Sequence, residues 1–132
     1  ALRATGRIQE SIAQYEGALR LAPNDADAHR NLGRSYAMLN RLPDAVAQFE
    51  QALRLTPASS DTQCELGMLL CMAGRIPEGL RHFEQALQLD PDNAQAHLYL
   101  AMALEQTGRS AEAASHFEQA RRLGASLPAS GN

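Results

Sequence analysis

The side chains best suited to chemistry are two cysteines, four methionines and four histidines. Cys64, Met68 and Cys71 share one face of a predicted helix, and soft sulfur ligands of this kind suit a metal such as Cu(I). Their i, i+4, i+7 spacing is also that of any helix face, so we predict no metal site. The two cysteines lie about 10 Å apart along the helix axis, which is too far for a disulfide. Free thiols favour a reducing compartment, and we expect a cytoplasmic location.

The histidines form two sets separated by 34 residues, His29 with His97 and His82 with His116. Such an offset reflects a repeated sequence rather than the spacing of metal ligands or catalytic groups. The sequence contains no nucleophile–base motif, Gly-rich phosphate loop or Cys-x-x-Cys pair, and no lysine. We therefore predict no catalytic residue, no cofactor and no enzymatic activity.

Composition excludes further classes of partner. The net charge is −3 and the 12 basic residues form no block, so we predict no nucleic-acid binding. With 45% hydrophobic and 20% charged residues, the chain has the composition of a folded protein rather than a disordered one. No apolar run is long enough to cross a bilayer, so we predict no membrane insertion by this segment.

The elements that position these side chains repeat every 34 residues. The matching segments are Gly6–Pro23, Asn40–Pro57, Gly74–Pro91 and Gly108–Ala125. Self-similarity at a fixed period of this length is typical of stacked supersecondary units, which present long binding surfaces.

Each period holds two segments with helical spacing of apolar residues, as in Leu42, Val46 and Phe49. Gly or Asn at the joins tolerates the left-handed conformation that ends a helix. Pro, Asn, Asp and Ser between periods predict helix ends and N-caps, and the acids that follow each join suit a helix N-terminus. The predicted helices cover residues 8–21, 26–39, 42–55, 60–73, 76–89, 94–107 and 110–123.

The order of small and large residues resembles the tetratricopeptide repeat (TPR) family, whose unit is a 34-residue helix–turn–helix. The best-matching unit contains Leu32, Gly33, Tyr36, Ala45, Phe49, Ala52 and Pro57. The resemblance implies an all-α fold: a right-handed α-α superhelix, or TPR solenoid, of seven antiparallel-paired helices with three full repeats plus an N-terminal half repeat. Its expected parts are 1–25 (second helix only), 26–59, 60–93, 94–123 (the C-terminal cap) and 124–132 (a flexible tail).

The resemblance also implies that the first helix of each pair lines a concave peptide-binding groove. The groove residues are then Asp27, Arg30, Asn31, Arg34, Met38, Asp61, Cys64, Glu65, Met68, Cys71, Met72, Leu98, Tyr99, Met102 and Glu105. This groove changes from basic at Arg30 and Arg34 to acidic at Glu105, which suits a peptide with an acid followed by apolar residues. Methionine adapts to varied partners, although Met68 and Met102 could instead pack between repeats. Glu65 would repel a carboxylate, which argues against the carboxylate clamp of chaperone-binding TPR domains.

The two ends of the array differ. The outward face of the last helix is polar, at Ser110, Ala114 and Arg121, as expected of a terminal repeat. The first repeat lacks its first helix, so Tyr15 and Ala18 are expected to lack a partner. We therefore expect the chain to be a piece of a longer protein, and expect a homodimer through the orphaned helix.

Two functions remain open. The first is a protein–protein interaction scaffold that binds a peptide or a partner segment in the groove. The second is an accessory C-terminal TPR segment of a larger enzyme or membrane protein, such as a glycosyltransferase, whose catalytic part lies upstream.

Overall fold

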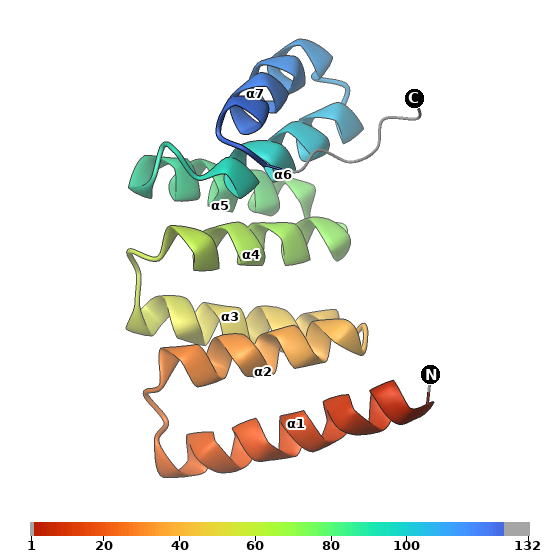
Figure 1. The fold of residues 1–132 in the computed structure, drawn as a ribbon, viewed down its shortest axis with the longest axis vertical. Helices are drawn as coiled ribbons and strands as arrows, with labels where there is room; N and C mark the ends of the chain where they lie inside the picture. Colours follow the sequence, from red (N-terminus) through yellow and green to blue (C-terminus); the bar gives the residue numbers. More distant parts are fainter. Residues whose placement is uncertain (1, 126–132) are drawn as a thin grey trace. The chain divides into compact units, whose positions relative to one another are not determined.

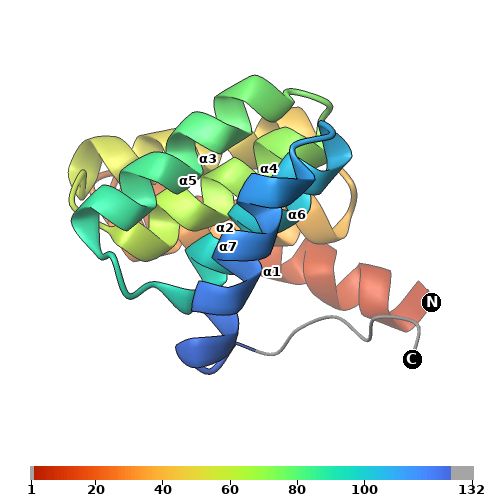
Figure 2. The ribbon, with the colours of Figure 1, turned by 90° about the horizontal axis from the view of Figure 1, so that it is seen from above.

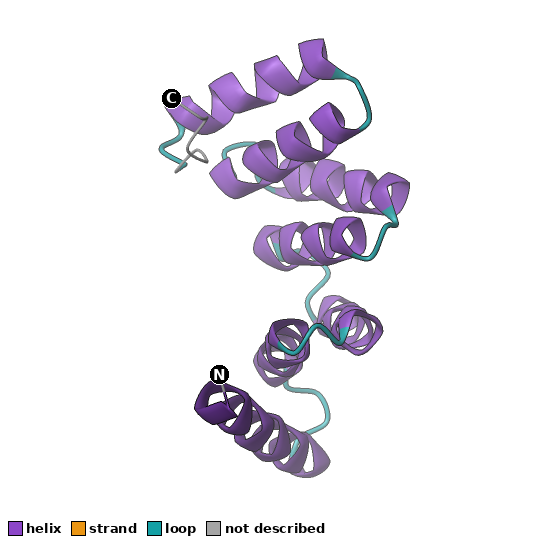
Figure 3. Cartoon of the chain, turned by 90° about the vertical axis from the view of Figure 1, so that its right-hand side faces the viewer, coloured by secondary structure: helices purple, strands orange, loops and turns teal. Residues whose placement is uncertain are grey.

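The computed structural model describes residues 2–125, which form seven α-helices and contain no strand (Figure 1). The helices are α1 (Leu2–Leu21), α2 (Ala26–Met38), α3 (Leu42–Leu55), α4 (Ser60–Met72), α5 (Ile76–Leu89), α6 (Ala94–Gln106) and α7 (Ser110–Arg122). Short loops join them (Figure 3). No helix of this part of the chain is long and apolar enough to cross a membrane.

The helices belong to two compact units that meet at Ala58 and Ser59. The first contains α1, α2 and α3, and the second contains α4 to α7. Helices pack most extensively in consecutive pairs, α2 on α3, α4 on α5 and α6 on α7. The all-α class and the predicted helix pairs are therefore confirmed.

The first helix of each pair begins at a side-chain cap. Asp25, Ser59 and Asn93 accept hydrogen bonds from the backbone N–H three residues later, at the starts of α2, α4 and α6. Asn93 is buried, and its Nδ2 also donates to Ser60 Oγ at 2.8 Å, which in turn donates to the carbonyl of Ala86. This chain of bonds ties the start of α4 to the end of α5 and the start of α6.

The second helix of each pair begins at an arginine that pairs with an acid three residues later. The pairs are Arg41–Asp44 at 2.9 Å, Arg75–Glu78 at 2.7 Å and Arg109–Glu112 at 2.8 Å. The sequence predicted the acids but not their arginine partners. Just before these arginines, Asn40, Gly74 and Gly108 have positive φ, as predicted for the joins.

The predicted join at Gly6 is wrong. Helix α1 runs without interruption from Leu2 to Leu21, and Gly6 is not among the residues with positive φ. A turn at this point would have to be held by an antiparallel helix before it, and residues 1–5 are too few to form one. Continuing the helix keeps its backbone hydrogen bonds, and the glycine costs only about 1 kcal/mol relative to alanine.

A phenylalanine fills the space between the helices of a pair, opposite a glycine. Phe49 and Phe83 are each 1% exposed. A Cβ added to Gly33 would lie 2.7 Å from the Phe49 ring, and one added to Gly67 would lie 2.8 Å from the Phe83 ring. The glycines therefore allow each ring to lie flush against the facing helix.

Helix α7 differs from the other second helices (Figure 2). Ser110, Ala114 and Arg121, which the sequence placed on a polar outward face, are all exposed. Phe117 is only half-buried, and alanine (Ala101) takes the position that glycine holds in the other two pairs. The extra methyl group leaves the last ring less room. Of the predicted tail, residues 126–132 lie outside the described residues.

Candidate functional site

The histidines belong to one repeated contact between the helices of a pair. The three pairs, each 19 residues apart in sequence, are His29 with Gln48, Gln63 with His82, and His97 with His116. Their polar atoms lie 2.8, 2.6 and 3.0 Å apart, respectively. Each position thus hydrogen-bonds its own partner within a helix pair, as expected of a structural column.

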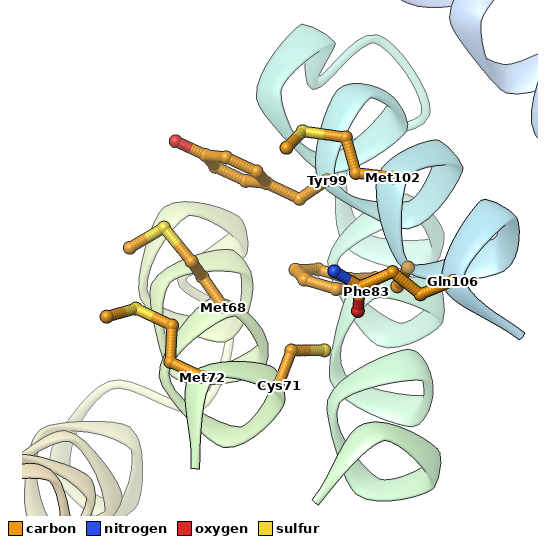
Figure 4. A pocket seen from close by; sticks show the side chains of 8 residues that line it. Met68, Cys71, Met72, Phe83, Tyr99, Met102 and Gln106 are labelled. Atoms are coloured by element: carbon orange, nitrogen blue, oxygen red, sulfur yellow. The ribbon is translucent and has the colours of Figure 1, made fainter. Parts of the chain in front are cut away.

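The second unit holds an open apolar cavity of about 300 Å³ between α4, α5 and α6 (Figure 4). Its lining residues are Met68, Cys71, Met72, Phe83, Tyr99, Met102, Ala103 and Gln106. None of these side chains carries a charge at neutral pH. A cavity of this size lies at the lower end of the range for ligand sites, and it matches an anchoring side chain better than a large ligand.

The cavity wall combines fixed aromatic and flexible thioether groups. The rings of Phe83 and Tyr99 stack with centroids 6.2 Å apart and an interplanar angle of 28°. Met68 is partly buried against the core, whereas Met72 and Met102 are 56% and 39% exposed. Figure 4 shows the thioethers of Met68 and Met72 beside the Tyr99 ring, with Met102 above them. Met68 therefore serves both packing and lining, while Met72 and Met102 offer exposed apolar surface.

Five of the predicted groove residues line this cavity: Met68, Cys71, Met72, Tyr99 and Met102. Two others, Cys64 and Leu98, lie instead in the interior, at 3% and 5% exposure, because their side of the helix packs on neighbouring helices. Sequence reasoning missed Phe83 and Ala103. Phe83 belongs to the conserved-length repeat column of phenylalanines and was assigned to the core alone, although one edge of its ring reaches the cavity.

The remaining predicted residues are charged or belong to the first unit. Asp61, Glu65 and Glu105 lie on α4 and α6 outside the cavity lining. The other five, Asp27, Arg30, Asn31, Arg34 and Met38, lie on α2, where Met38 is 69% exposed. The cavity is therefore built from the second unit alone.

Both thiols are poorly suited to nucleophilic or metal chemistry. Burial raises the pKa of the Cys64 thiol to about 12, with smaller contributions from Asp61 and Glu65. Burial also raises the pKa of Cys71. Thiols react and bind metals as thiolates, so both groups are largely unreactive at neutral pH. Within residues 2–125, no group of three or more His, Cys, Asp or Glu could hold a metal ion.

Comparison with known families identifies the repeat. The tetratricopeptide repeat model matches residues 1–60 and 64–128. The chain belongs to the tetratricopeptide repeat family. The resemblance inferred from Gly33, Phe49 and their repeated counterparts is thus confirmed.

Solved structures of TPR proteins show the same fold. A crystal structure of MamA has 21% identity and a TM-score of 0.82, covering 88% of this chain and 68% of that one. MamA from Desulfovibrio magneticus RS-1 has 22% identity and a TM-score of 0.82, covering 92% and 69%. A structure of MamA AMB-1 has 30% identity and a TM-score of 0.76, covering 94% and 69%. The chain thus spans about two thirds of the length of these structures. No curated protein sequence matches it.

Family membership places the chain in a broad functional class. TPR arrays are in general non-catalytic scaffolds for protein interaction, because stacked helix pairs expose extended surfaces without building an enclosed reaction site. The apolar cavity of the second unit is where this chain departs most from an ordinary polar surface.

Proposed function

We propose that the chain is a protein-interaction module that binds a peptide segment of a partner on the cavity face of α4 and α6. The observation that carries this proposal is the cavity of about 300 Å³ with exposed Met72 and Met102 at its edge. Contact with an apolar side chain would remove this surface from water, which stabilises a complex by roughly 25 cal/mol per Å² before the cost of association.

The methionines also suit a binding role physically. A thioether side chain has three rotatable bonds and a polarisable sulfur atom, so it adjusts to the shape of a ligand without steric strain. The stacked Phe83 and Tyr99 rings supply a fixed wall against which such adjustment takes place. The accessory-segment hypothesis concerns residues outside this chain and stays a prediction, as does the homodimer through α1.

A peptide library displayed on phage tests the proposal. Peptides selected on the wild-type chain are synthesised, and their affinity is measured by fluorescence anisotropy for the wild type and for Met72→Glu/Met102→Glu. We expect the double substitution to weaken binding at least about tenfold, because it places charges in an apolar contact.

The repeat supplies a matched control. Met38 lies 34 residues before Met72 and is exposed, but it belongs to α2 and lines no part of the cavity. Met38→Glu should therefore leave affinity nearly unchanged. Selected peptides that bind the double variant as tightly as the wild type would show that the cavity is not the binding site.

A further inference from the structure

The charges around the cavity are of one sign. Helices α4 and α6 contain no lysine or arginine, while Asp61, Glu65 and Glu105 supply three acids. The cavity lining itself is uncharged. Any electrostatic preference for a ligand therefore comes from carboxylates next to an apolar centre.

Helix spacing places these acids along the same faces as the methionines. Glu65 precedes Met68 by three residues, and Glu105 follows Met102 by three. Residues three or four apart lie on the same side of a helix, so one carboxylate adjoins the lining of α4 and another that of α6. The acids thus flank the cavity at both helices.

The influence of Glu65 reaches the cavity wall. Burial raises the pKa of Tyr99, and the charge of Glu65 raises it further, after a contribution from Cys64. Glu65 also contributes to the raised pKa of the buried Cys64 thiol. A second negative charge brought to this place by a ligand would be unfavourable, whereas a cation would be favourable.

We infer that the occupant of the cavity is a partner-protein segment in which lysine or arginine flanks a bulky apolar side chain. This inference rests on the proposed function and names the class of peptide. It differs from the sequence-based expectation of an acid followed by apolar residues, which depended on Arg30 and Arg34. Those arginines lie on α2, whereas the cavity is built from α4, α5 and α6.

The test compares three synthetic versions of one library-selected peptide, with the same apolar centre and with lysine, glutamine or glutamate at the flanking positions. We expect the lysine version to bind the full chain roughly tenfold more tightly than the glutamine version, as a few exposed ion pairs would give. This advantage should shrink at high salt, because exposed charges are screened.

Charge reversal assigns the preference to its source. Glu105→Lys should reduce the lysine preference severalfold, whereas Glu84→Lys should preserve it. Glu84 gives the same change in net charge but lies on α5, in a different cavity that shares no lining residue with the first. Circular dichroism of both variants checks that the helices are retained.

Each outcome separates the two proposals. Binding that is equal for all three peptides, or tightest for the glutamate version, overturns this inference and leaves the peptide-binding proposal standing. A lysine preference that survives Glu105→Lys unchanged also overturns it. If none of the peptides binds, or if Met72→Glu/Met102→Glu has no effect, both proposals fail. Self-association of the chain that Met72→Glu abolishes would identify a second copy as the occupant and overturn the inference.

Discussion

Single glycines decide how closely the helices of the second unit approach. A Cβ on Gly67 would meet the Phe83 ring at 2.8 and 2.9 Å and the carbonyl oxygen of Gly79 at 2.9 Å. A Cβ on Gly79 would in turn collide with Cys71 Sγ and lie 2.7 Å from the carbonyl oxygen of Gly67. The backbones of α4 and α5 therefore pack against each other where both lack side chains.

Gly67→Ala should destabilise the protein by about 1–3 kcal/mol, because the added methyl must displace a fully buried ring or the facing backbone. Urea unfolding monitored by circular dichroism measures the effect. Gly17→Ala is the matched control, since a Cβ there would meet only the end of Arg20 at 3.6 Å. That substitution within helix α1 should stabilise by about 0.4–1 kcal/mol. Equal effects of the two would contradict the packing described for Gly67.

Much of this residue-level detail follows from local sequence, and some does not. The caps Asp25, Ser59 and Asn93 were predictable because capping depends on residues within one turn. The cavity was not, because it depends on how far α4 and α6 stand apart, which spacing along one helix does not determine. For the same reason the burial of Cys64 escaped prediction.

Among the elements, the pair α6 and α7 has a contact that the other pairs lack. His97 Nε2 donates to the carbonyl of Pro91 at 3.0 Å, so the Nδ1 of neutral His97 accepts from His116 Nδ1 at 3.0 Å. The two rings stack with centroids 5.2 Å apart. The other pairs join histidine to glutamine, so only here do two titrating groups hold helices together.

Acid should weaken the α6–α7 contact. Burial lowers the pKa of His116, and the positive charge that His97 can carry lowers it further, while Glu112 and Glu84 act in the opposite direction. Arg109 lines the same small cavity as His116. Because the folded pKa is below the unfolded one, the unfolded state takes up the proton first. Stability is therefore complete above the unfolded value of about 6.5 and falls as the pH drops towards the folded value.

His116→Gln makes the last pair equivalent to His29 with Gln48. Between about pH 7.5 and pH 5.5, the wild type should lose more unfolding free energy than this variant. The difference between their urea midpoints at the two pH values is the measurement. The remaining histidines are present in both proteins and cancel. Identical losses in the two proteins would show that His116 does not respond to pH in this way.

At the scale of the whole molecule, the repeat determined the class and the helix pairs, and the exceptions occur where the repeat pattern ends. Helix α1 absorbs the expected turn at Gly6, since no earlier helix is available to hold it. Helix α7 exposes the three positions that are apolar in earlier repeats. Both exceptions follow from missing neighbours, which a pattern within one repeat does not report.

The placement of the two thiols gives the chain a built-in gauge of occupancy. Cys71 lines the cavity and is half-buried, whereas Cys64 is 3% exposed with a pKa of about 12. A maleimide reagent should therefore modify Cys71 first, slowly at neutral pH and faster as the pH rises towards its elevated pKa. Because the chain has no lysine, side-chain amines do not compete for the reagent. A peptide seated in the cavity should slow this modification in proportion to the fraction bound, as mass spectrometry would record, and unchanged labelling at saturating peptide would place the peptide elsewhere.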